Sequence, residues 1–111
     1  MTGPTYGGVI AKSSGLSGGS ELQRVMDAAR TPEWSFGLGR QGQIMATRDS
    51  GQIGLPWVVL ASKAGRGMRV SKYQPGDDVD VEGEIVGEIS GNPREMGRQL
   101  RSLLGDLELG P

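Results

Sequence analysis

The chain of 111 residues has the length of one domain, and its core must be modest because apolar residues make up 35% of the sequence and aromatic residues 5%. It contains no histidine and no cysteine, which excludes disulfide bonds, thiol chemistry and the side chains that most often serve as general bases and transition-metal ligands. The net charge of −1 excludes a strong overall attraction to nucleic acid or to an anionic membrane surface.

Residues 1–19 are rich in glycine, serine and threonine, which predicts a flexible arm before a single α+β domain over 20–111. The arm carries few large apolar side chains, among them Tyr6, Val9 and Ile10. An arm of this composition cannot fold alone, so we expect these side chains to contact another subunit. Neither a signal-peptide pattern nor an apolar run of ~18 residues is present, so we expect a soluble protein, in the cytoplasm or within a particle, without a membrane partner.

The first helix is predicted to begin at Ser20. This serine is a suitable N-cap, and Gln23 stands at the third helical position of a capping box. Apolar side chains then recur at the spacing i, i+3, i+4 and i+7, at Leu22, Val25, Met26 and Ala29. Pro32 follows, and the residue before a proline is unfavourable for a helix, so the helix is expected to end before it.

Glycine-containing turns divide the middle of the chain into short segments rich in β-branched and aliphatic residues, which predicts successive strands. The predicted strands are 34–38, 43–47, 57–62, 68–73 and 79–89. Because the connections are short, these strands are expected to pair in an antiparallel meander of about five short strands.

Residues 37–42 match the glycine pattern G-x-G-x-x-G of dinucleotide-binding loops. Such a loop lies between a strand and a helix, whereas here the next predicted element is another strand. We therefore interpret these residues as a hairpin connection whose glycines adopt positive φ, without a bound cofactor.

Apolar and acidic residues alternate in the last predicted strand. The apolar side chains occupy odd positions, at Val79, Val81, Ile85 and Ile89. The acidic side chains occupy even positions, at Asp80, Glu82, Glu84 and Glu88. This alternation predicts a half-buried strand with a solvated acidic face, and the ligand order of a calcium loop is missing, so no metal is expected.

The C-terminal helix has the strongest local signals. Asn92 is a suitable N-cap, Pro93 occupies the first helical position and Glu95 the third. One side of the helix carries an apolar stripe, formed by Met96, Leu100, Leu103, Leu104 and Leu107. The other side carries a row of arginines, Arg94, Arg98 and Arg101. The helix is therefore expected to pack its leucine stripe on the sheet.

No acidic residue occurs from Gly51 to Gly76, and this stretch contains four cations. They are Lys63, Arg66, Arg69 and Lys72. If the protein binds nucleic acid, these side chains are the expected phosphate contacts, because glycines between them allow a close approach of the backbone.

The side chains present do not form a general acid–base pair with a third orienting group, so neither enzymatic activity nor catalytic residues are expected. The leading hypothesis is a non-enzymatic structural or assembly module, a subunit of a larger oligomer such as a phage-type particle, with protein as its partner. The alternative is a small regulatory or nucleic-acid-associated binding protein.

Overall fold

The computed structural model describes residues 16–109, apart from the side chains of 16–20 and of Gln41. Within this range the chain forms two helices and one five-stranded antiparallel sheet, which confirms the predicted α+β fold. The elements in chain order are α1 (Leu16–Ala29), β2 (Ser35–Leu38), the 3-10 turn η2 (Arg40–Gly42), β3 (Ile44–Arg48), β4 (Trp57–Ala64), β5 (Gly67–Tyr73), β6 (Glu84–Ile89) and α2 (Pro93–Asp106). Of these helices, neither has both the length and the apolar character needed to cross a membrane.

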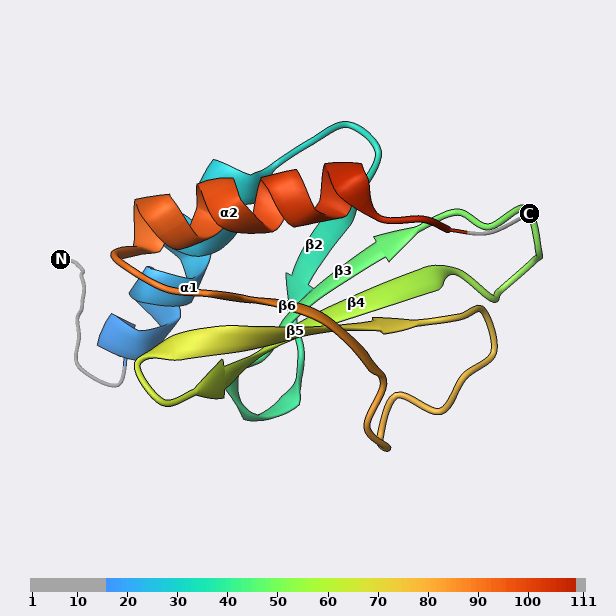
Figure 1. The fold of residues 1–111 in the computed structure, drawn as a ribbon, viewed down its shortest axis with the longest axis horizontal. Coiled ribbons are helices and arrows are strands. Elements are labelled where there is room, and N and C mark those ends of the chain that lie inside the picture. The colour runs from blue at the N-terminus through green and yellow to red at the C-terminus, as the bar shows by residue number, and fades with distance from the viewer. Residues whose placement is uncertain (1–15, 110–111) are drawn as a thin grey trace, which may run out of the picture.

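The sheet is a simple meander in the order β2-β3-β4-β5-β6, as predicted (Figure 1). Its register places apolar side chains of neighbouring strands opposite each other, as in the pairs of Ala61 with Ile44 and with Val70. Because side chains alternate along a strand, every second residue of the central strands faces the helices. One face of the sheet therefore forms the floor of the core.

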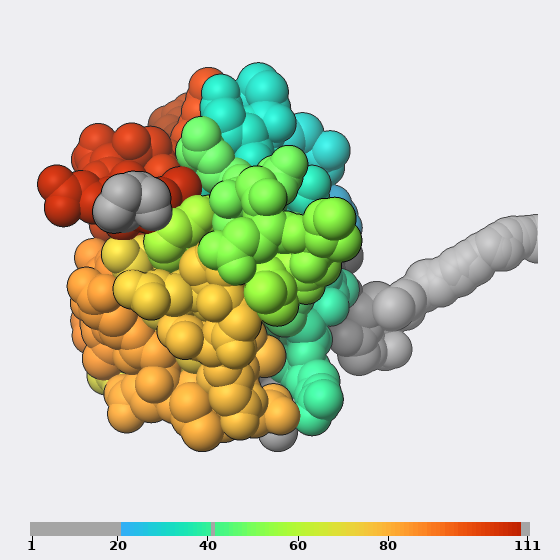
Figure 2. All heavy atoms as spheres, turned by 90° about the vertical axis from the view of Figure 1, so that its right-hand side faces the viewer, coloured from blue at the N-terminus to red at the C-terminus, as the bar shows by residue number. Residues whose placement is uncertain are grey.

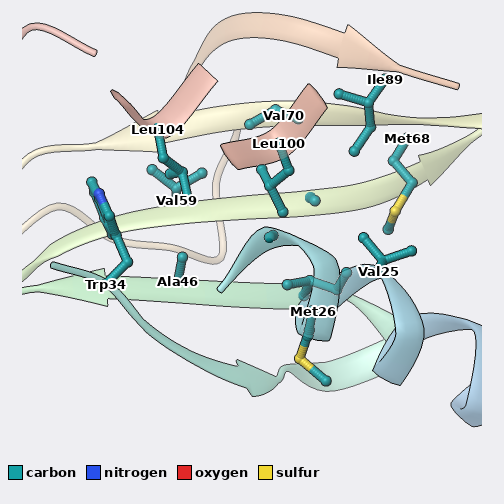
Figure 3. Packing of buried hydrophobic residues seen from close by; sticks show 13 residues of the cluster. Val25, Met26, Trp34, Ala46, Val59, Met68, Val70, Ile89, Leu100 and Leu104 are labelled. Atoms are coloured by element: carbon teal, nitrogen blue, oxygen red, sulfur yellow. The ribbon is translucent and has the colours of Figure 1, made fainter. Parts of the chain in front are cut away.

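Both helices cover that face and cross each other closely. A Cβ added at Gly97 of α2 would overlap the Ala28 side chain and lie 2.5 Å from the Val25 carbonyl oxygen in α1. Figure 3 shows side chains of both helices, among them Val25 and Leu100, beside buried side chains of the strands. The buried cluster includes Val25 and Met26 of α1, Leu100 and Leu104 of α2, and Ile44, Val59, Met68, Val70 and Ile89 of the strands.

The start of α2 is confirmed in detail. The Asn92 side chain accepts a hydrogen bond from the Glu95 backbone N–H at 2.8 Å, and the Glu95 carboxylate accepts one from the Asn92 backbone N–H at 3.0 Å. This reciprocal capping box satisfies two backbone donors that a helix otherwise leaves unpaired. In the apolar stripe Leu100 and Leu104 are buried, whereas Leu103 is half-buried.

The predicted start of the first helix is wrong. α1 begins at Leu16, so Ser20 lies inside the helix and is not its N-cap. Gly18 and Gly19 disfavour a helix by about 1 kcal/mol each relative to alanine, but propensity is a weak constraint that tertiary packing overrides. Residues 16–19 of the predicted arm thus belong to α1, whereas residues 1–15 lie outside the described range, together with the expected contacts of Tyr6, Val9 and Ile10.

The last predicted strand is also corrected, because β6 begins only at Glu84 and residues 79–83 form a connection. The Tyr73 hydroxyl donates a hydrogen bond to the Val81 carbonyl oxygen at 2.7 Å, and the Tyr73 ring packs directly on Gly83. These contacts hold the connection on the face of the sheet that the helices leave open.

A β-bulge breaks the predicted alternation within β6. Gly87 is opposite Val70, but Ile85 is opposite Ser71, so β6 has one extra residue at this point. Side chains before and after the bulge therefore change faces. Ile89 is buried under the helices, whereas Ile85 is exposed, and the expected single apolar face does not form.

Candidate functional site

An apolar groove of about 540 Å³ opens at one end of the molecule. It lies where the β2–β3 and β4–β5 connections meet the first half of α1 and the start of α2, at the left of Figure 1. The apolar side chains that line it come from these four parts of the chain: Leu22, Val25, Leu38, Met68, Pro93 and Met96.

Glycines shape the walls of this groove. Gly42 has a φ of +72°, which lets η2 end and β3 begin within one residue. The Gly39 N–H then donates to the Gln43 carbonyl oxygen at 2.7 Å and closes the connection. At Gly67 a side chain would collide with the Ile89 carbonyl group, so β5 and β6 approach each other here only because the residue is glycine.

The glycine pattern at residues 37–42 thus ends β2 and forms the hairpin connection to β3, as expected from the strand that follows it. Positive φ is confirmed for Gly42 alone, because Gly39 has an extended backbone with a φ of −88°. No helix begins directly after these glycines within the described chain, and β3 follows instead.

The rim of the groove is charged. Lys63, near the end of β4, and Arg66, in the β4–β5 connection, line the groove together with Glu21 of α1. Leu38, the last residue of β2, also lines the groove, and 55% of its surface is exposed. The groove therefore combines exposed apolar surface with a positive rim.

The structure separates the four cations that were expected to act together. Lys63 and Arg66 line the groove, but Arg69 lies on the opposite face, where its Nε is 3.6 Å from the Glu88 carboxylate. Lys72 is at the far end of β5 and only 14% exposed. Its ammonium group donates to the Glu108 carbonyl oxygen at 2.9 Å, lies 3.7 Å from the Glu84 carboxylate and stacks 6.0 Å from the centre of the Trp57 ring.

Strand geometry explains this separation. Lys63 pairs with Met68 at the hairpin end of the sheet, whereas Lys72 pairs with Val59 near the other end. Along β5, Arg69 is one residue from Met68, the partner of Lys63, and three residues from Lys72. Because side chains alternate along a strand, Arg69 points to the opposite face of the sheet. The four cations therefore do not lie together: within the described structure only Lys63 and Arg66 share one site, and phosphate contact stays a prediction.

The arginine row of α2 is exposed, as expected for the solvent side of an amphipathic helix. Its members are Arg94, Arg98 and Arg101. Among residues 16–109 none of these arginines is within ion-pair distance of a carboxylate.

The acidic connection between β5 and β6 covers part of the outer face of the sheet. Val79 lines a pocket together with Met45 and Leu60 of the sheet, and Asp80 is 3.8 Å from the Arg40 guanidinium group. Among the side chains described, no group of three or more Asp and Glu residues could hold a metal ion. The acidic side chains of this connection are exposed.

The turn after α1 contains a polar contact between two side chains. The Thr31 hydroxyl donates a hydrogen bond to the Glu33 carboxylate and so lowers the pKa of that carboxyl below its ordinary value. The Glu33 backbone N–H donates in turn to the Thr31 hydroxyl oxygen at 3.3 Å. Both residues lie in the turn before β2, so the contact stabilises a turn at the surface.

Sequence reasoning missed the groove and one exposed loop. The groove residues are far apart in sequence, and each was assigned only to its own strand or helix. The β3–β4 connection carries Ile53 and Leu55 at its tip, both exposed. Both sites contain apolar residues between turn residues, as in Gly-Leu-Gly at 37–39 and Gln-Ile-Gly-Leu-Pro at 52–56. This pattern was the signal that could have indicated exposed apolar side chains.

Comparisons with known proteins do not assign a function to the groove. No protein-family model, no curated protein and no solved structure matches this chain.

Proposed function

We propose that this protein is a non-enzymatic assembly module, a subunit of a larger oligomer that binds an apolar segment of a neighbouring chain in the groove. The observation that carries the proposal is the groove of about 540 Å³, with its apolar walls and the exposed Leu38 at its mouth. Burial of such surface is worth roughly 25 cal/mol per Å² of apolar area, which favours association. Contiguous apolar surface of this kind is a mark of interaction sites.

The neighbouring sheet edge supports a protein partner rather than a small molecule. Leu38 ends β2, which within the described sheet pairs only with β3. The free backbone groups of an edge strand suit the addition of an extended segment. A closed or filamentous particle of the phage type, in the cytoplasm or released from it, is the setting that we propose for such a subunit.

Size-exclusion chromatography with light scattering tests the proposal. The wild-type protein is expected to show a mass that rises with concentration above the 11.7 kDa of one chain. Leu38→Lys places a charge at the mouth of the groove and should leave a monomer. Val81→Lys is the matched control, because Val81 is 59% exposed but lies on the outer connection. A Leu38→Lys variant that assembles like the wild type, or a wild type that stays monomeric, contradicts the proposal.

The alternative of a nucleic-acid-associated protein rests on Lys63 and Arg66, which form no ion pair within residues 16–109. Binding of a labelled duplex that weakens steeply with salt, and is lost in the double variant Lys63→Ala and Arg66→Ala, supports this alternative. Equal loss from substitution of the α2 arginines indicates diffuse attraction instead.

A further inference from the structure

The β3–β4 connection presents an apolar tip at the end of the molecule opposite the groove. Ile53 is fully exposed and Leu55 is 41% exposed. Figure 2 views the molecule from this end and shows residues near 50–56, in green, at the surface above the orange β5–β6 connection. The tip thus offers two aliphatic side chains to solvent at a place where a folded monomer gains nothing from them.

The tip is held in shape by its own hydrogen bonds. The Asp49 carboxylate accepts from the Gly51 N–H at 2.8 Å, and the Ser50 hydroxyl oxygen accepts from the Gln52 N–H at 3.1 Å. The Ser50 hydroxyl donates in turn to the Leu55 carbonyl oxygen. A tip that is already ordered loses little conformational entropy when it binds a partner.

The tip and the groove of one molecule cannot meet. β4 begins directly after the tip at Trp57 and ends beside the groove at Ala64. At about 3.3 Å per residue its eight residues span roughly 25 Å. Figure 1 shows the β3–β4 connection and the β4–β5 connection, which borders the groove, at opposite ends of the sheet. Contact between them therefore requires a second copy of the chain.

The charges of the two features are complementary. Asp49 is the only charged residue in the segment 49–56. The groove rim carries Lys63 and Arg66 against the single carboxylate of Glu21. A tip entering a groove brings opposite charges together, whereas two tips or two grooves facing each other bring like charges together.

We propose that the β3–β4 tip of one copy inserts Ile53 and Leu55 into the groove of the next copy. This inference rests on the proposed function, because it names the segment that the groove binds. Each copy then retains one free tip and one free groove, so the contact is heterologous. Such contacts produce a ring if the rotation closes and a filament if it does not.

The test uses a tip variant, Ile53→Lys, and the groove variant Leu38→Lys, with Val81→Lys as the control. Each of the first two is expected to be monomeric alone, with the circular-dichroism spectrum of the wild type. In an equimolar mixture, the intact tip of the Leu38→Lys variant can still enter the intact groove of the Ile53→Lys variant. The mixture should therefore give a dimer of twice 11.7 kDa and nothing larger.

Assembly of Ile53→Lys at wild-type mass, while Leu38→Lys is monomeric, overturns the inference but leaves the proposed groove function intact. Loss of assembly on deletion of residues 1–15, with Ile53→Lys unaffected, would identify the N-terminal segment as the occupant instead. A mixture that stays monomeric also contradicts head-to-tail contact.

Charge reversal provides a second, independent readout. Asp49→Lys and Arg66→Asp are each expected to weaken the association constant by about fivefold, a typical effect of one partly exposed charge pair. The double variant should bind more tightly than the sum of the two separate losses predicts, because the reversed charges again attract each other, although the hydrogen bond from the Gly51 N–H to the Asp49 carboxylate stays lost. Additive losses in the double variant exclude a contact between these two side chains.

Discussion

At the scale of single residues, the close crossing of α1 and α2 depends on a missing side chain. Gly97 of α2 faces Ala28 and the backbone of Val25 in α1 without room for a Cβ. Glycine inside a helix costs about 1 kcal/mol relative to alanine, so the close packing of the two helices must offset this cost. The small residue is therefore explained by the crossing of α1 and α2.

Gly97→Ala is expected to destabilise the protein by about 1–3 kcal/mol, because the added methyl group pushes the helices apart. Gly105→Ala in the same helix is the control, since a Cβ there meets no atom within 4 Å among the described residues. That variant should gain up to about 1 kcal/mol from helix propensity. Urea denaturation measures both, and equal shifts of the two variants would contradict the close crossing.

At the scale of elements, α2 docks through two of the leucines in its stripe. Leu100 and Leu104 are buried against the sheet and α1, whereas Leu103 is half-buried and lies over Gly87 of β6. Leu103 therefore contributes less buried surface to the core than Leu100 and Leu104 do. Its side chain covers the edge of the sheet instead of filling the core.

Leu104→Ala is expected to cost about 2–5 kcal/mol, because it leaves a cavity in the core. Leu103→Ala should cost clearly less, since part of that side chain already contacts water. The difference in the free energy of unfolding, taken from urea melts of the two variants, checks this order. A larger loss from Leu103→Ala would mean that α2 is rotated relative to the present structure.

The elements also show what a sequence can predict. The start of α2 and the central strands follow local signals, namely the cap at Asn92, the proline after it and β-branched runs between glycines. The start of β6 could not be predicted in this way. It depends on the contact of Tyr73 with Val81 and on the bulge opposite Val70, and both join residues of different elements. The groove is hidden from the sequence for the same reason.

At the scale of the whole molecule, the meander separates two apolar features by the length of the sheet. The groove lies at the β4–β5 end and the tip at the β3–β4 end. A two-fold symmetric contact uses the same patch on both copies, whereas a heterologous contact uses two different patches. In an assembly through tip and groove, each copy with a neighbour on both sides must therefore have both of its ends shielded from solvent.

Hydrogen exchange followed by mass spectrometry at rising protein concentration distinguishes these cases. Amides near residues 51–55 and those near 38–42 and 65–68 are expected to exchange more slowly as the oligomer forms, because both regions lose contact with water. Residues 74–83 cover the outer face and serve as the internal control, with unchanged exchange. Protection confined to the groove end would indicate a two-fold contact between grooves. Protection confined to the tip end would leave the groove without an occupant and contradict the assembly proposed here.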